Sequence, residues 1–248
     1  MTGTSERHTE IAERLRVVRE RIDHACTRAG REAGEIGLVV VTKFFPATDI
    51  EHLVDLGVTD IGENKDQEAG AKVAELGEQV REAVTVHFIG QLQTNKANRV
   101  TRYADVVQSV DRARLVTALD RGVANAVEGG ERHTSLDVTL QVDLGEGEDQ
   151  GRGGALPDDL PGLAETVAAT EHLRLRGLMA VAPFGLDEVG TRAAFDRLAA
   201  LGERLRSDHP EATWLSAGMS GDLESAIAAG ATHLRVGSAI LGSRPEHR

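Results

Sequence analysis

The chain has 248 residues, a formal net charge of −12 and a single cysteine, Cys26. The acidic balance argues against nucleic acid as a partner, because phosphate backbones bind to basic surfaces, and one cysteine excludes an internal disulfide framework. No apolar run is long enough to cross a membrane and no secretory signal opens the chain, so we expect a cytoplasmic globular protein without a membrane partner.

Metal and nucleotide sites also lack support in the sequence. The nine histidines are scattered, and no paired-histidine or paired-cysteine motif occurs. The glycine-rich fingerprints of P-loop and Rossmann proteins are missing as well. We therefore expect no metal site and no nucleotide-binding fold.

The first predicted element is an amphipathic helix. Apolar residues recur three or four positions apart from Ile11 to Ala25, and Gly30 closes the pattern. Beyond this helix, short β-rich runs alternate with helical ones. Eight strands are expected, at residues 37–43, 60–64, 84–91, 106–111, 137–144, 173–182, 213–218 and 233–239. Helical patterns fill the gaps, at residues 47–57, 66–80, 93–104, 112–127, 159–170, 190–207 and 221–231.

This alternation predicts an α/β protein with a single (β/α)8 TIM barrel. We expect residues 1–248 to form one domain, in which residues 1–30 are an extra helix packed on the barrel. An open doubly wound sheet is the alternative, but it usually has fewer units and a nucleotide-binding turn. The loop at 145–157 is Gly-rich and falls between the fifth and sixth strands, where a barrel tolerates a mobile active-site loop.

The first predicted strand runs directly into Lys43. Of the twenty-eight basic residues, only four are lysine, at positions 43, 65, 72 and 96. Lysine differs from arginine in that it can lose its proton and attack a carbonyl to form a Schiff base. A lysine that merely reaches solvent from the strand end is the alternative. The mouth of a barrel, where the C-terminal strand ends meet, is the place for the first role.

The loops after the seventh and eighth strands are rich in small residues. "SAGMS" supplies Ser216 and Gly218, and "RVGSA" supplies Gly237 and Ser238. Barrels often bind phosphate in these two loops through backbone N–H groups, and glycine lets the backbone approach an anion closely. A capped helix start and a structural glycine are the alternative interpretations of the two loops.

Arg235 lies two residues before Gly237, so strand alternation places both on the face toward the barrel interior or mouth. An internal ion pair with Glu63 or Asp143 is one explanation, and a ligand acceptor is the other. A lysine amine, a phosphate cradle and an arginine together favour pyridoxal 5′-phosphate (PLP), with Lys43 on the aldehyde and Arg235 facing the pyridine nitrogen.

The same segments carry a family resemblance. "VVVTKFFPA", "IGENKDQEA", "VHFIGQLQTNK", "LRLRGLMAV" and "LSAGMSGDLESAIAAGATHLRVGSAILGSR" cover nearly all the chain after the first helix. They resemble the pyridoxal phosphate homeostasis protein family, relatives of the N-terminal barrel of alanine racemase. The resemblance implies a one-domain barrel that binds PLP, influences the balance of B6 vitamers and amino or keto acids, and has no established catalytic turnover.

The resemblance also implies roles for individual residues. It makes Lys43 the aldimine lysine, Arg235 the ring-nitrogen arginine, and Asn64 and Met219 parts of the pocket wall. The phosphate-binding positions that it implies are Ser216, Gly218, Gly237 and Ser238. The chain departs from the family in two places. Arg152 followed by two glycines stands where many members have a lysine before a glycine, and Phe44 replaces a more common polar residue.

Two functions remain open, a carrier of PLP and an amino-acid racemase. A two-base racemase needs a second acid–base group opposite Lys43, which alanine racemase supplies as a tyrosine from an extra domain across a dimer. This chain ends just past the barrel, and its single tyrosine, Tyr103, is expected away from the mouth. His87 could act as a weak second base, although a hydrogen-bonded core histidine is preferred. A phosphosugar enzyme would need a Glu or Asp base paired with a lysine, which no spacing here supplies. We expect a non-catalytic monomer that supplies PLP to PLP-dependent apo-enzymes.

Overall fold

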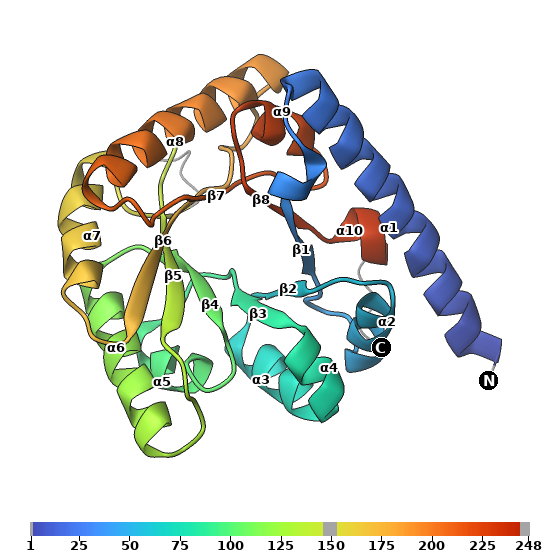
Figure 1. The fold of residues 1–248 in the computed structure, drawn as a ribbon, viewed down its shortest axis with the longest axis horizontal. Helices are drawn as coiled ribbons and strands as arrows, with labels where there is room; N and C mark the ends of the chain where they lie inside the picture. Colours follow the sequence, from blue (N-terminus) through green and yellow to red (C-terminus); the bar gives the residue numbers. More distant parts are fainter. Residues whose placement is uncertain (1, 146–152, 244–248) are drawn as a thin grey trace.

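The computed structural model describes residues 2–145 and 153–243. Eight parallel strands form a closed barrel in which each strand pairs with the next and β8 pairs with β1 (Figure 1). The strands are β1 Gly37–Val41, β2 Asp60–Glu63, β3 Thr85–Phe88, β4 Val106–Val110, β5 Leu136–Gln141, β6 Leu173–Met179, β7 Trp214–Ser216 and β8 His233–Val236. The predicted fold class and all eight predicted strands are confirmed, each shortened at one or both ends.

The helices surround the barrel and fill the gaps between strands, as expected. The α-helices are α1 Thr2–Ala29, α2 Ala47–Asp55, α3 Asp66–Glu75, α4 Glu78–Ala83, α5 Ala97–Val100, α6 Ala113–Glu128, α7 Leu160–Ala168, α8 Glu188–Asp208, α9 Leu223–Ala228 and α10 Ser238–Leu241. The described residues also form three short 3-10 helices: η1 Ala33–Glu35, η2 Thr94–Lys96 and η3 Pro157–Asp159.

Three predicted elements differ from the structure in a way that changes the path of the chain. The helix expected at 66–80 is two helices, because the chain leaves α3 in extended conformation at Leu76 and Gly77 before α4 begins. The helix expected at 93–104 is reduced to η2 and the four-residue α5. The strand expected at 233–239 ends at Val236, and α10 begins at Ser238. The small residues after β8 therefore turn the chain into a helix at the barrel mouth.

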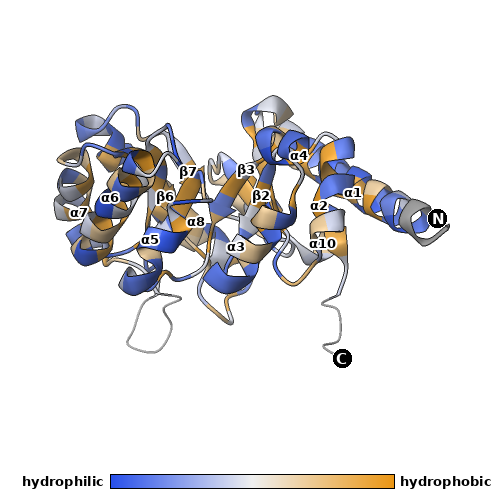
Figure 2. Ribbon diagram, turned by 90° about the horizontal axis from the view of Figure 1, so that it is seen from below, coloured by the Kyte–Doolittle hydropathy of each residue, from blue (hydrophilic) through white to orange (hydrophobic). Residues whose placement is uncertain are grey.

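Apolar residues of the strands and the inner helix faces form the core. The strands near the centre are largely apolar, whereas the outer helices alternate apolar and polar residues (Figure 2). In α6, for example, Leu115, Leu119 and Val123 are fully buried and recur at helical spacing. Burial of such side chains is the main favourable contribution to folding.

Helix α1 lies along the outside of the barrel, against α9 and α10 (Figure 1). The apolar stripe seen in the sequence is the face that it buries. Ile11, Leu15 and Val18 are at most 1% exposed, and Ile22 and Ala25 are buried as well. The N-terminal helix is therefore packed on the last part of the chain, next to the strand pair β8–β1 that closes the barrel.

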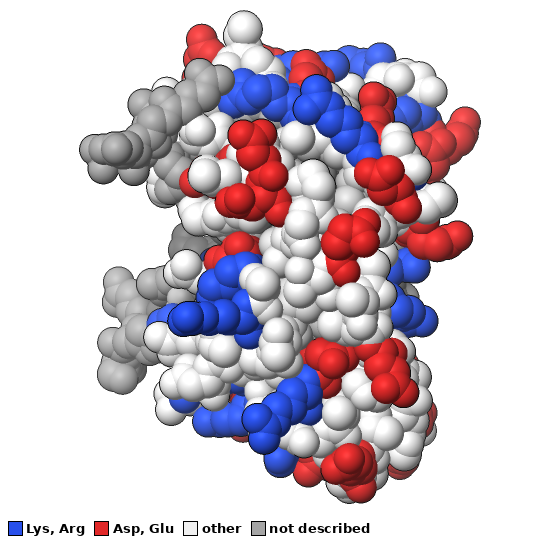
Figure 3. Space-filling view, turned by 90° about the vertical axis from the view of Figure 1, so that its left-hand side faces the viewer, with Lys and Arg blue, Asp and Glu red and all other residues white. Residues whose placement is uncertain are grey.

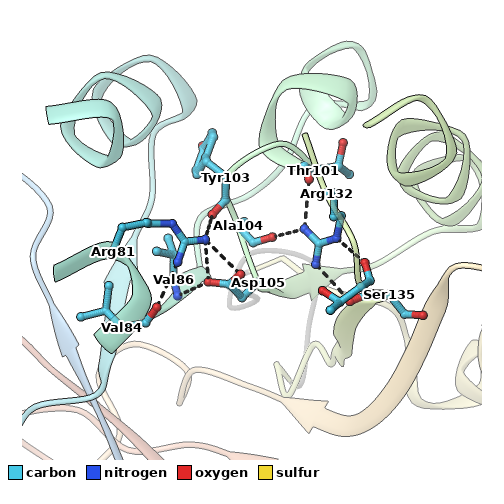
Figure 4. Close-up of polar contacts among 10 residues, drawn as sticks. Arg81, Val84, Val86, Thr101, Tyr103, Ala104, Asp105, Arg132 and Ser135 are labelled. Carbon is cyan, nitrogen blue, oxygen red and sulfur yellow. Dashed lines mark hydrogen bonds and ion pairs between the residues drawn. The ribbon is translucent and has the colours of Figure 1, made fainter. Parts of the chain in front are cut away.

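Arginine side chains tie neighbouring segments together by donating to backbone carbonyls. Arg81 donates to the carbonyls of Val84 and Tyr103 and to the carboxylate of Asp105 (Figure 4). Arg132 donates to four carbonyls, those of Thr101, Ala104, Thr134 and Ser135. Burial lowers the pKa of this guanidinium. The fork of N–H donors explains why a chain that needs such bridges uses arginine rather than lysine.

The surface carries both signs of charge. Acidic and basic side chains are interspersed over the face shown in Figure 3. In the described part of the chain, none of the helices is long and apolar enough to span a membrane.

Candidate functional site

A cavity of about 520 Å³ opens at the C-terminal ends of the strands. Its walls come from the segments after β1, β2, β3, β6, β7 and β8, so strands far apart in sequence contribute to one site. Six of the eight predicted site residues line it: Lys43, Asn64, Met219, Arg235, Gly237 and Ser238. Ser216 and Gly218 are not in the wall. The other lining residues are Val41, Ile89, Gly90, Met179, Val181, Ser220 and Gly221.

Lys43 lies two residues past the end of β1, and the residue before it is held firmly. Thr42 is fully buried, and its hydroxyl donates to Glu63 Oε1 over 2.6 Å. The ammonium of Lys72 donates to the Thr42 carbonyl over 2.8 Å and to the same Glu63 oxygen over 2.7 Å. These contacts fix the backbone from which the Lys43 side chain enters the cavity.

The Lys72–Glu63 ion pair is almost completely withdrawn from solvent, with side chains 6% and 0% exposed. Burial raises the pKa of Glu63, while Lys72 and Thr42 act in the opposite direction. Glu68 is a second partner of Lys72, at 3.2 Å. Since Glu63 is committed to Lys72, the internal pair with Arg235 considered from the sequence does not form.

Arg235 reaches the cavity from β8 and is 4% exposed. Its guanidinium donates to the Ser216 hydroxyl over 2.6 Å and to the Ala180 carbonyl over 2.7 Å. Among the described residues no carboxylate pairs with it, and burial lowers its pKa to about 10. Guanidinium has five N–H donors, so three remain without a hydrogen bond in that part of the chain. A buried cation in this state favours an acceptor in the cavity.

Ser216 belongs to a chain of hydrogen bonds behind Arg235. Its buried hydroxyl accepts from Arg235 and donates to the Gln108 side-chain oxygen over 2.7 Å. The Gln108 amide lies 2.9 Å from His87 Nδ1, and His87 Nε2 lies 2.9 Å from an Asp60 oxygen. Each group thus has a partner if His87 is protonated on Nε2 and neutral. The preferred interpretation of His87 as a hydrogen-bonded core histidine is confirmed.

Gly218 also lies behind the cavity wall, and its conformation explains the glycine. With φ +93°, it adopts a backbone that other residues rarely take, and an added Cβ would lie 2.6 Å from the Cβ of Ala226. Its carbonyl accepts from the Arg235 backbone N–H over 2.9 Å. The turn at Gly218 carries the chain to Ser220 and Gly221, which do line the cavity.

The two small-residue loops present free backbone donors. Within the described residues, no hydrogen bond is made by the backbone N–H groups of Ser220 and Gly221, or of Gly237 and Ser238. All four residues line the cavity. Glycine at two of the four positions keeps Cβ atoms out of the approach to these donors.

Asn64 forms the wall between this cavity and a neighbouring one. The second cavity, of about 500 Å³, is lined by the segments 64–68 and 91–93 and by Phe88 and Lys96. The backbones at Asn64 and Gly90 approach each other closely. An added Cβ at Gly90 would lie 2.2 Å from the Asn64 carbonyl oxygen. The buried Asn64 side-chain oxygen has no hydrogen-bond partner in the described structure.

Of the two departures from the family pattern, Phe44 lies within the described residues. Phe44 adopts φ +71°, rare outside glycine, and its N–H donates to Glu68. Its ring centre lies 5.9 Å from Lys43 Nζ and 5.5 Å from Lys65 Nζ, so it stands between two ammonium groups. Arg152 lies outside the described residues. Tyr103 is absent from the cavity lining, as expected, and burial raises the pKa of its hydroxyl.

Sequence reasoning missed two supporting residues, Lys72 and Gln108. Lys72 follows Glu68 by four positions on α3, a helical ion-pair spacing that indicates a contact but not burial beneath Lys43. Gln108 is a polar residue of β4, a strand whose five positions are all buried, and its position in "VVQSV" could have indicated an internal hydrogen-bond network.

Comparison with known proteins places this architecture in a family. Residues 11–245 match the family model described as alanine racemase, N-terminal domain. A protein of Mycobacterium tuberculosis named pyridoxal phosphate homeostasis protein is 42% identical over 98% of this chain and 96% of its own length.

Two solved structures extend the comparison. PipY from Synechococcus elongatus, solved with PLP bound, superposes with a TM-score of 0.77 and 33% identity, covering 94% of this chain and 100% of that one. Alanine racemase from Corynebacterium glutamicum shares the fold at 17% identity and a TM-score of 0.63, covering 96% of this chain and 61% of the racemase.

Proposed function

The chain belongs to the alanine racemase N-terminal domain family and to the pyridoxal phosphate homeostasis proteins within it, and we propose that it binds PLP in the cavity at the barrel mouth and takes part in PLP homeostasis. The observation that carries this proposal is the convergence of Lys43, Arg235 and two loops of free backbone donors on one cavity. The cavity volume lies within the roughly 300–1,000 Å³ usual for small-molecule sites.

Each part of the cavity suits one part of PLP. Lys43 would hold the aldehyde end, because its amine is a nucleophile that can condense with an aldehyde to a Schiff base with loss of water. The backbone N–H groups of Ser220, Gly221, Gly237 and Ser238 hold the phosphate. Arg235 would donate one of its remaining N–H groups to the pyridine nitrogen.

The other predicted site residues have supporting roles in this proposal. Asn64 and Met219 are wall residues, and the buried Ser216 and Gly218 act through Arg235, which they hold by its side chain and its backbone. When bound, the cofactor supplies an electrophilic carbon and an aromatic ring that can take up electron density.

The lining favours a carrier over a racemase. Among the described lining residues, Lys43 and Arg235 are the only titratable side chains. Arg235 can only donate a hydrogen bond, so the ring nitrogen stays unprotonated and stabilises a carbanion weakly. His87 is fully buried and held between Gln108 and Asp60, which argues against the second base considered from the sequence.

A protein that binds PLP without catalytic turnover can serve as a carrier of the cofactor. We propose that residues 1–248 act as one cofactor-binding domain, as a cytoplasmic monomer that takes up PLP and supplies it to PLP-dependent apo-enzymes. A weak amino-acid racemase is the second candidate. Lys43 favours it, because a Schiff-base lysine is one of the two acid–base groups that a racemase needs.

Borohydride trapping tests the proposal. The protein is mixed with PLP, reduced, digested and mapped by mass spectrometry. We expect the reduced adduct on the Lys43 peptide alone. A label spread over Lys65, Lys72 and Lys96 as well, or none at all, would mean that Lys43 is only a strand-end lysine. Racemisation of a panel of amino acids by the loaded protein, followed by chiral chromatography, decides between carrier and enzyme.

A further inference from the structure

Side chains of the N-terminal helix hold one loop assigned to the phosphate and the end of the short helix that follows the other loop. Arg21 of α1 donates to the carbonyl of Ser220, in the loop after β7, over 3.1 Å. Arg7, near the start of the same helix, donates to the carbonyl of Leu241, the last residue of α10, over 3.0 Å. Helix α10 begins with Ser238, which lines the cavity.

Carboxylates fix the orientation of both guanidinium groups. Arg21 binds both oxygens of Glu224 on α9, each over 3.0 Å. Arg7 binds both oxygens of the buried Asp49 on α2, over 2.6 and 3.3 Å. A planar fork can satisfy a carboxylate and a carbonyl together, which the single ammonium of lysine cannot do in the same geometry.

The segments that these arginines hold are too short to be rigid alone. Helix α9 has six residues and α10 has four, far below the length at which isolated helices are stable. Arg31, just after α1, makes a third contact of this kind. It donates to the carbonyls of Ile227 and Ala231 at the end of α9, over 3.1 and 2.7 Å. The N-terminal segment thus contacts 220–241 through main-chain carbonyls at four points.

We propose that α1 sets the affinity of the protein for the phosphate group, and that Arg21 is the main positioning residue. The inference rests on the proposed function. Arg21 holds the carbonyl of Ser220, and the neighbouring N–H groups at Ser220 and Gly221 are then aimed into the cavity. Lys43 follows β1, where Lys72 and Glu63 hold the preceding residue, Thr42, without any contact from Arg21. Loosening α1 would therefore weaken phosphate binding and leave aldehyde capture unchanged.

The test compares PLP with pyridoxal, which has the aldehyde and lacks the phosphate. Dissociation constants for both are measured by absorption titration on the full-length wild type, Arg21→Ala and Arg21→Lys. Arg16→Ala is the matched control. Arg16 is another arginine of α1 that is paired with glutamate, but its two partners, Glu13 and Glu20, lie on the same helix. Circular dichroism and thermal unfolding show whether each variant is folded.

We expect Arg21→Ala to weaken PLP binding about tenfold, the size of one charge-assisted hydrogen bond, and to leave pyridoxal binding unchanged. Arg21→Lys should lose most of the same affinity, and Arg16→Ala none. Inorganic phosphate should compete less well for the Arg21→Ala variant than for the wild type. Equal losses for PLP and pyridoxal, or no loss for either, would overturn the inference. A wild type that binds neither ligand would instead refute the proposed function.

Discussion

The two ends of the barrel use polar residues in opposite ways. At the closed end, where the strands begin, Asp60 pairs with His87, and His233 bonds to Thr232 while its ring contacts Trp214. At the mouth, Arg235 has no carboxylate partner among the described residues, and buried oxygens of Asn64 and Glu63 lack hydrogen bonds there. TIM barrels place their functional sites at the mouth, whereas residues at the opposite end serve stability. Buried polar groups without hydrogen bonds at the mouth lower the stability of the fold but are available to bind a ligand.

The largest expected effect comes from removing the amine at the mouth. Lys43→Ala should abolish the absorption band of a lysine-bound aldehyde entirely, because the other three lysines lie outside the cavity lining. Its free energy of unfolding should fall by no more than about 1 kcal/mol, the size of an exposed cation–π contact such as the one between Lys43 and the Phe44 ring. Absorption titration and urea unfolding check both parts. A persisting band of normal intensity would place the captured aldehyde elsewhere.

Lys72→Met should instead cause a large loss of stability. It leaves Glu63 charged and buried without its partner, which costs about 3–5 kcal/mol. Urea unfolding at pH 7 measures the change. The double variant Lys72→Met/Glu63→Gln should recover most of it, because no uncompensated charge remains. A Lys72→Met protein as stable as the wild type would show that the mouth does not depend on this buried pair.

Acid should destabilise the closed end through His233. Burial, and then the nearby His87, lower the pKa of His233 to about 4, below the roughly 6.5 of an unfolded histidine. The folded state therefore binds fewer protons in this window. The contribution of neutral His233 is fully present above about pH 6.5 and is lost as pH falls toward 4, up to about 3 kcal/mol. Unfolding free energies of the wild type and His233→Gln at pH 7 and pH 5 test this, and equal pH dependence would contradict it.

A smaller loss of stability than that of Lys72→Met is expected at Arg235. Arg235→Met removes a buried charge without orphaning a carboxylate, but it leaves the Ala180 carbonyl and the Ser216 hydroxyl without their donor. The free energy of unfolding should therefore fall by about 1–2 kcal/mol, less than in Lys72→Met. The affinity for PLP should nevertheless fall, because the pyridine nitrogen of the cofactor loses the hydrogen-bond donor that Arg235 supplies. Paired unfolding and binding titrations distinguish this result from a loss comparable to that of Lys72→Met, which would make Arg235 a structural residue.

The sequence predicted the fold well because each strand is a short apolar run between helical patterns. It also predicted that Lys43 and Arg235 would reach one mouth, since both stand at strand ends. It could not predict which loop residues face the cavity. The positive φ of Gly218 turns the chain so that Ser220 and Gly221 line the wall, while Ser216 bonds to Gln108, a residue of another strand. Which loop residues line the cavity depends on contacts between segments far apart in the sequence, and the periodicity of apolar residues carries no information on such contacts.

The most direct test of the proposed site is a crystal structure of the protein grown with PLP. We expect continuous density from Lys43 Nζ to the cofactor, Arg235 at the pyridine nitrogen, and the phosphate on the N–H groups of Ser220, Gly221, Gly237 and Ser238. A phosphate bound in the neighbouring cavity beside Lys65 and Lys96, with Lys43 unmodified, would contradict the assignment of the site.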